Sequence, residues 1–163
     1  MEQSKRSGAN VIRTILIAGI IAGILDSAAA SVVFYFKLGL SPAQVMQYIA
    51  SALYGSDAFS GGTAMVIIGT LLHFAISFVI AAVYFYAYPV ISQLRKWPVI
   101  SGLLLGFAVW LFMNLVVIPF SKIQRTPFEL SAVLISVVWH MVLVGLPISL
   151  ITKRHFERTH RFN

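Results

Sequence analysis

Four long apolar runs, seldom interrupted by charge, constrain the fold of this chain more than any other feature. Each run is long enough to cross a bilayer, which takes ~20 residues in a helix. Of the 163 residues, 59% are hydrophobic and only 10% are charged, whereas about a quarter of the residues in a soluble domain are charged. We therefore predict an all-α fold, a four-transmembrane-helix bundle that forms a single integral membrane domain over residues 1–163.

The predicted spans cover residues 14–36, 63–88, 97–118 and 128–151. The basic N-terminal residues and Ala28–Ala30 would also fit a cleavable signal peptide. Because apolar residues continue to Phe36, we favour an uncleaved span. Tyr84, Tyr86 and Tyr88 are expected to form an aromatic belt at a membrane interface, and Pro147 is expected to bend the last span.

A short helix is predicted over residues 41–54, between the first and second spans. Ser41, Pro42 and Gln44 form the pattern of a capping box with proline at the first helical position. Apolar Val45, Ile49 and Leu53 lie opposite the polar residues of this segment. The segment is too short to span, so we expect it to lie in the membrane interface. A second capping pattern, T-P-F-E at residues 126–129, is expected to open the last span.

Basic residues determine the expected orientation. They are concentrated in the N-terminal segment, in the link at Arg95 and Lys96, and in the C-terminal tail, whereas the other side carries only Lys37, Lys122 and Arg125. The positive-inside rule then predicts that both termini are cytoplasmic. The formal charge of +7 is therefore read as topology and lipid contact, with no nucleic acid as partner.

Asp26 lies in the middle of the first apolar run and needs an explanation. It shares one face of the predicted helix with Gly19 and Gly23. Small residues allow close approach of another helix, and we expect helix packing at the following glycines: Gly19, Gly23, Gly69, Gly102 and Gly106. A charged Asp at a helix centre costs ~2.5–3.5 kcal/mol, so Asp26 must be protonated, paired or hydrated.

Three other polar residues are candidate partners of Asp26. Counting ~1.5 Å per residue along each span places Asp26, His73 and His140 in one layer near the bilayer middle, with Asn114 nearer the outer face. The sequence thus predicts a buried polar cluster of Asp26, His73, Asn114 and His140. Trp110 and Trp139, also in mid-span, are expected to be packing residues.

Several readings of this cluster stay open. It could hold the helices in register by hydrogen bonds, or form part of an ion or proton pathway, since histidine titrates near neutral pH. Alternatively, His73 and His140 could be axial ligands of a b-type haem with Gly69 making room beside the ring, or Asp26 and both histidines could bind a non-haem metal. A scaffold or accessory subunit is a further class, with a second copy or another membrane protein as partner.

Enzymatic activity is not expected. The chain has no cysteine, which excludes disulfides and Cys-ligated metal sites. It also shows no Ser-His-Asp order and no Gly-rich phosphate loop. We therefore predict no catalytic residues, no metal site and no cofactor in the leading interpretation.

Several segments resemble small bacterial membrane proteins of the YagU-like inner-membrane family. They are Tyr48–Gly62, L-L-H-F around His73, Met113–Ser121 and Val144–Leu150. The resemblance covers about residues 11–154 and implies location in a bacterial cytoplasmic membrane. It implies no particular chemistry, so no catalytic residue is carried over. It directs attention to Asp26, His73, Asn114 and the turn at Gly145–Pro147.

Overall fold

The chain forms an all-α bundle in which four helical stretches are long and apolar enough to cross a membrane. The computed structural model describes residues 2–124 and 129–160, and side chains from residue 8 to residue 158 within these ranges. The crossing stretches are α1 (Glu2–Leu38), α3 (Gly62–Val90), α5 (Pro98–Phe112) with the π-helical η2 (Met113–Val117), and α6 (Leu130–Trp139) with the π-helical η3 (His140–Gly145) and α7 (Leu146–His160). The connections contain α2 (Pro42–Tyr54), η1 (Gly55–Phe59) and α4 (Ser92–Lys96).

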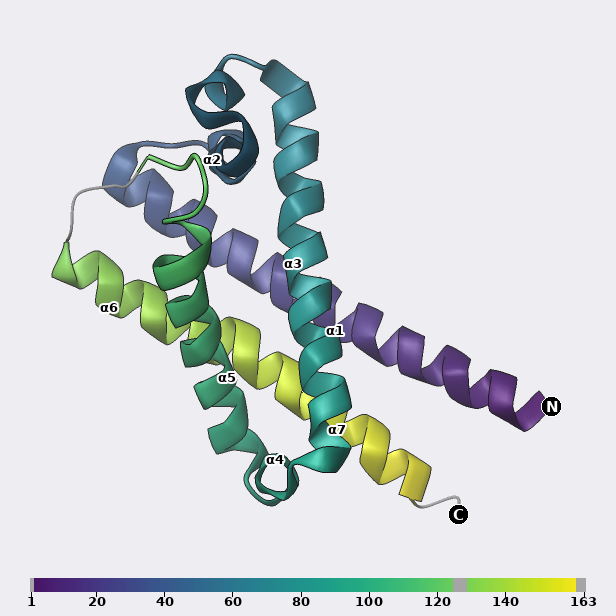
Figure 1. The fold of residues 1–163 in the computed structure, drawn as a ribbon. Helices are drawn as coiled ribbons and strands as arrows, with labels where there is room; N and C mark the ends of the chain where they lie inside the picture. The colour runs from purple at the N-terminus through teal and green to yellow at the C-terminus, as the bar shows by residue number, and fades with distance from the viewer. Residues whose placement is uncertain (1, 125–128, 161–163) are drawn as a thin grey trace.

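The predicted four-span architecture is confirmed, and the helices are mostly longer than predicted. The segments that could span a membrane are Gly8–Leu38, Gly62–Val90, Pro98–Val117 and Leu130–Arg158. In Figure 1, α1 and the α6–α7 stretch run obliquely behind the steeper α3 and α5. The second span continues through Pro89 to Val90, and the polar link after it forms the short helix α4. The predicted T-P-F-E cap includes residues 126–128, which lie outside the described residues.

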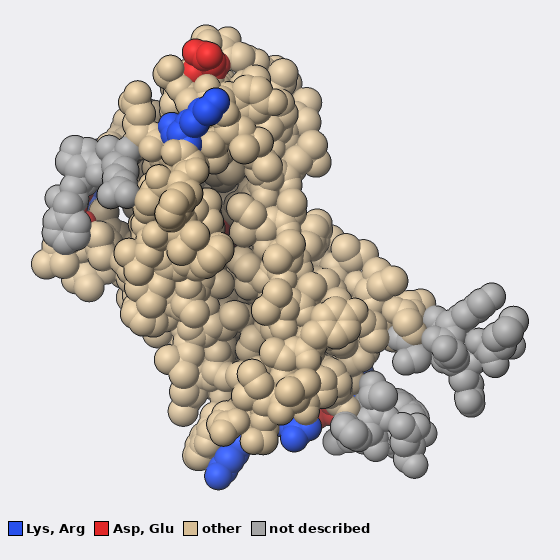
Figure 2. Space-filling model, viewed as in Figure 1, with Lys and Arg blue, Asp and Glu red and all other residues tan. Residues whose placement is uncertain are grey.

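Charged residues lie near the two ends of the bundle. Both termini and α4 lie at one end, and α2 and the link between α5 and α6 lie at the other (Figure 1). On the face in Figure 2, Lys and Arg gather near these ends and the surface between them is almost entirely uncharged. At the α2 end, Lys37 donates to Glu129 and to Ser131. The hydrogen bonds that Glu129 accepts from Lys37 and from Ser131 Oγ lower the pKa of its carboxyl.

The turn from α1 into α2 depends on the backbone conformation of Gly39 and on the helix cap formed by Ser41. Gly39 adopts φ 68°, a left-handed conformation that favours glycine, and Leu40 N donates to Phe34 O at 3.3 Å. Ser41 then caps α2: its Oγ accepts from Gln44 N, and Gln44 Oε1 accepts from Ser41 N. The predicted capping box is thus confirmed.

The face that α2 turns toward the protein is partly polar. Gln47 and Ser51 are buried together with Val45, whereas Leu53 is 54% exposed. Gln47 Nε2 donates to Gly62 O at 3.4 Å, and Ser51 Oγ donates to Tyr48 O at 2.6 Å. Two polar side chains therefore face the bundle, and α2 packs on α3.

The last crossing stretch changes helical geometry in its middle. Over His140–Gly145 the helix is π-helical, and Leu146 N donates to Met141 O. Pro147 follows at once; it lacks an N–H, and its ring is incompatible with a regular carbonyl position four residues earlier. The wider turn accommodates this proline, so the expected distortion takes the form of a π-helical segment.

Each of the predicted packing glycines lies where helices touch. A Cβ at Gly19 would meet Phe78, one at Gly23 would meet Phe74, and one at Gly69 would meet the Met46 carbonyl of α2. Gly102 and Gly106 lie against the stretch from His140 to Ser149, and Gly145 faces back toward both glycines. At these positions the missing side chain lets the neighbouring element approach closely.

The expected aromatic belt on α3 is wrong for two of its three tyrosines. Tyr84 and Tyr88 are buried, and only Tyr86 is exposed. The Tyr84 hydroxyl lies 2.8 Å from Ser101 Oγ and 2.7 Å from Ser149 Oγ. The hydroxyl group thus joins α3, α5 and α7 in the part of the bundle nearest the termini.

Replacing Tyr84 with phenylalanine is expected to destabilise the bundle by ~1 kcal/mol, because a buried hydroxyl with two partners is removed. The free energy of unfolding in mild detergent measures this effect. Tyr86→Phe, two residues away on the same helix and 63% exposed, is the matched control and should unfold like the wild type. Equal stability of both variants would contradict an energetic role for the Tyr84 hydroxyl.

Candidate functional site

Asp26 lies on the side of α1 that packs against the last crossing stretch. Trp139 Nε1 donates a hydrogen bond to Asp26 Oδ1 at 2.8 Å. His140 Nε2 lies 3.8 Å from the same oxygen. The Asp26 side chain is 21% exposed and that of His140 is 14% exposed. The aspartate thus has two partners from consecutive residues, at the junction of α6 and η3.

His140 is held by its own helix in one orientation. Its Nδ1 lies 2.7 Å from Ser136 O, and a carbonyl can only accept, so Nδ1 carries the hydrogen. This leaves Nε2, which faces Asp26, as the ring nitrogen that can gain or lose a proton. The ring also stacks on Trp139, with centroids 5.3 Å apart and 20° between the planes.

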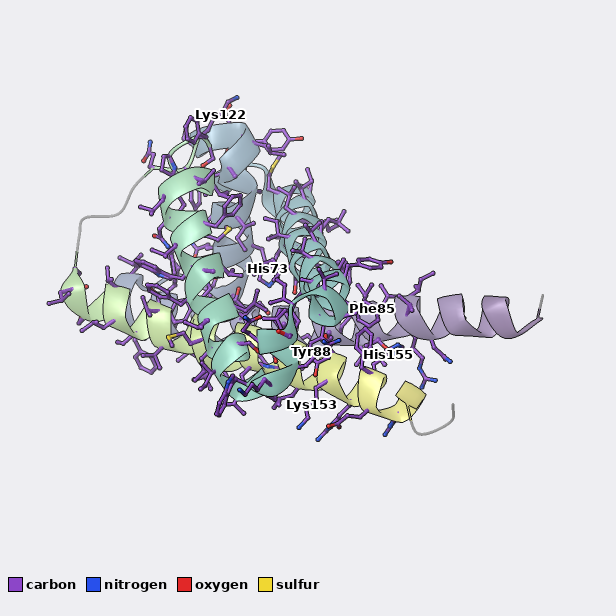
Figure 3. The ribbon with its side chains drawn as sticks, turned by 60° about the horizontal axis from the view of Figure 1, so that its bottom comes forward. His73, Phe85, Tyr88, Lys122, Lys153 and His155 are labelled. Carbon is purple, nitrogen blue, oxygen red and sulfur yellow. The ribbon has the colours of Figure 1, made fainter. Side chains whose placement is uncertain are left out.

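His73 reaches the same region from α3. Its Nε2 lies 2.9 Å from Gly23 O, one turn before Asp26 on α1. By the same reasoning Nε2–H donates to this carbonyl, and Nδ1 is the nitrogen available for proton exchange. In Figure 3, His73 lies in the interior of the bundle, between Lys122 at one end and Lys153 at the other.

One cavity touches all three ionisable side chains. It has a volume of about 170 Å³, and its lining includes Asp26, His73 and His140. A buried water needs ~10–15 Å³ of such volume, so the cavity has room for several waters. It extends along Ala30 and Phe34 of α1 to Val45, Tyr48 and Ile49 of α2, which places one end near α2.

The opposite end of the cavity meets the apolar core. Ser77 and Val144 line the cavity there, and Ser77 Oγ donates to Gly19 O at 2.8 Å. Beyond them lie buried residues of the core cluster, among them Ala18, Ala81 and Ile148. The cavity is thus closed toward the termini by tightly packed side chains.

Asn114 does not join this site, which corrects the prediction of a four-residue buried cluster. Its side chain is exposed, and Nδ2 donates to Trp110 O of its own helix at 2.9 Å. Asn114 lies in the π-helical η2 and is absent from the cavity lining. Asp26 and His140 are also only partly buried, so the site is an accessible, mainly apolar cavity with a few polar groups rather than a sealed cluster.

Trp139 is the functional residue that the sequence analysis missed. Its position beside His140 was visible, but the direction of its N–H could not be read from spacing. Tyr48 was also missed: it lines the cavity from α2, and burial raises the pKa of its phenol. Tyr48 therefore stays protonated at neutral pH. Trp110, in contrast, packs as expected while its Nε1 donates to Ser136 Oγ at 2.8 Å.

The residues do not fit a haem or a metal ion. Among the described residues, no three His, Cys, Asp or Glu side chains lie close enough together to hold a metal. The space beside Gly69, where haem was expected, is taken by the Met46 carbonyl. The cavity is also smaller than the ~300–1,000 Å³ pockets that enclose drug-sized ligands, and haem is larger than most of these.

Comparisons with known proteins returned no relative: no family model, curated protein or solved structure matches the chain. The fold and the site therefore define an integral membrane protein with a four-span helical bundle and a mainly apolar cavity that contains Asp26.

Proposed function

We propose that this membrane protein conducts protons through the cavity at Asp26, with His73 and His140 as exchange partners. The observation that carries the proposal is that one cavity, with room for several waters, is lined by Asp26, His73 and His140 together. Ionisable groups inside membrane spans are costly and mark ion or proton routes. A purely structural cluster would not need a shared cavity.

The hydrogen bonds of the two histidines support proton exchange. Each ring donates one N–H to a backbone carbonyl, which fixes its orientation and leaves the second nitrogen for exchange. Nε2 of His140 then faces a carboxylate oxygen at 3.8 Å. This gap exceeds the ~2.6–3.2 Å reach of a direct hydrogen bond, so proton exchange between the two groups runs through a water.

The orientation gives the pathway a direction. We place both termini in the cytoplasm because Arg95, Lys96 and Lys153 lie at their end of the bundle, in accord with the positive-inside rule. One end of the cavity then lies near α2 on the outer side. The packed core around Ile148 separates the cavity from the cytoplasm, so conduction also requires protons to cross this core. The sequence resemblance supports location in a bacterial cytoplasmic membrane.

A proton-flux assay tests the proposal. The full chain is reconstituted in vesicles of phosphatidylethanolamine and phosphatidylglycerol with an internal pH dye, and an external acid pulse is applied. Wild-type vesicles should acidify faster than protein-free vesicles, and His140→Ala should slow acidification because the group facing Asp26 is lost. Asp57→Asn, in the η1 segment outside the spans, is the control and should behave like the wild type. A wild-type rate equal to that of protein-free vesicles would leave only the structural interpretation.

A further inference from the structure

The residues that line the cavity are suited to a guest larger than a proton. Asp26 is the single acidic residue among the lining residues, and none of them is Lys or Arg. The walls carry the aromatic rings of Phe34, Tyr48 and Trp139. Aromatic faces attract cations through the ring quadrupole, so walls and carboxylate together suit a guest of positive charge.

The lining does not suit an inorganic cation. Ca²⁺ takes six to eight oxygen ligands, and Mg²⁺ demands a near-octahedral set. The side-chain oxygens of the lining belong to Asp26, Tyr48 and Ser77, and the Ser77 hydroxyl already donates to Gly19 O. A cation that fits must therefore bring apolar surface of its own to contact residues such as Ile49, Ile76 and Ile80.

The volume limits the size of such a guest. The cavity measures about 170 Å³, and an apolar cavity of ~150 Å³ accepts benzene. A cation of about five non-hydrogen atoms, such as tetramethylammonium, therefore fits, whereas a drug-sized cation does not.

We infer that this cavity binds a small alkylammonium cation, with the ammonium group beside Asp26 and the alkyl groups against the aromatic and aliphatic walls. The inference rests on the proposed function in that both use Asp26. The titratable groups that share the cavity with Asp26 are His140 from η3, His73 from α3 and Tyr48 from α2, while α5 contributes the uncharged Val109 and η2 the uncharged Met113. Protons on the Asp26–His140 pair remove the negative charge that the ammonium group needs, so proton and cation compete.

Calorimetric titration of the full chain in mild detergent with tetramethylammonium chloride tests the inference. Saturable binding of tetramethylammonium by the wild type is expected. Asp26→Asn should abolish binding, and Asp57→Asn should preserve it. Sodium chloride at equal ionic strength should give no saturable heat.

Three results would overturn the inference: no saturable heat with the wild type, binding unchanged in Asp26→Asn, or equal binding of sodium. The vesicle assay separates this outcome from failure of the proposed function. Proton flux without tetramethylammonium binding would reject the alkylammonium site alone. Binding without proton flux would reject the proton pathway alone.

Discussion

Vesicles that contain the Asp26→Asn variant should acidify no faster than protein-free vesicles, while the variant unfolds within about 1 kcal/mol of the wild type. Asparagine has nearly the shape of aspartate. Its carbonyl oxygen can accept from Trp139 Nε1, as Asp26 Oδ1 does at 2.8 Å, and this same oxygen is the one that lies 3.8 Å from His140 Nε2. The substitution thus keeps the shape of the side chain and the hydrogen bond from Trp139, and removes the ability to bind and release a proton.

This combination separates the functional from the structural interpretation. If Asp26 only pins the helices in register, Asp26→Asn should conduct and fold like the wild type. A matched pair of measurements, acidification rate in vesicles and unfolding free energy in detergent, is made on Asp26→Asn and on the control Asp57→Asn. Wild-type flux in Asp26→Asn would remove this residue from the pathway.

The spans and their packing glycines could be predicted because they depend on local properties. The length of an apolar run is enough to predict a helix that crosses the membrane. Small residues four positions apart indicate a close helix contact even when the partner helix is unknown. The shared layer of Asp26, His73 and His140 followed from counting helical rise, and the structure places all three on one cavity. The depth of a residue along its helix can thus be predicted from the sequence even when its contact partners cannot.

Directions around a helix were harder to predict. The π-helical segments η2 and η3 begin at Met113 and His140, and a wider turn shifts the angular position of each following residue. Asn114 was assigned to the cluster from its depth and not from its direction around the helix, and its amide bonds to its own helix. Trp139 ends the regular part of its helix, and the direction of its N–H depends on a side-chain rotamer that spacing does not encode.

The inward face of α2 shows a second limit. In water, apolar side chains gain free energy by burial, so a hydrophobic face points inward. Lipid is as apolar as leucine, and this driving force is lost. Leu53 is therefore exposed, while Gln47 and Ser51 turn inward. Gln47 donates to Gly62 O of α3, and Ser51 donates to Tyr48 O of its own helix.

Replacing Gly106 with alanine is expected to lower the free energy of unfolding by ~3 kcal/mol, at the upper end of overpacking effects. A Cβ at this position would overlap the His140 carbonyl group and Met141 Cα. These are backbone atoms, which cannot rotate away as a side chain can. Gly145 faces Gly102 O and Gly106 N from the other side, so the two stretches must separate along their whole contact.

Separation of α5 from η3 should also displace His140 from Asp26, so Gly106→Ala should lose proton flux as well as stability. Two glycines of α1 serve as reference positions for the loss of unfolding free energy in detergent. Gly8→Ala introduces a Cβ with nothing within 4 Å and should leave stability unchanged or slightly raised. Gly19→Ala meets mainly the ring of Phe78, which can move, so its loss should lie between the two. The backbone contact between α5 and η3 is the reason for expecting the largest loss of stability in Gly106→Ala. If Gly106→Ala unfolds like Gly8→Ala, this contact does not hold the site together.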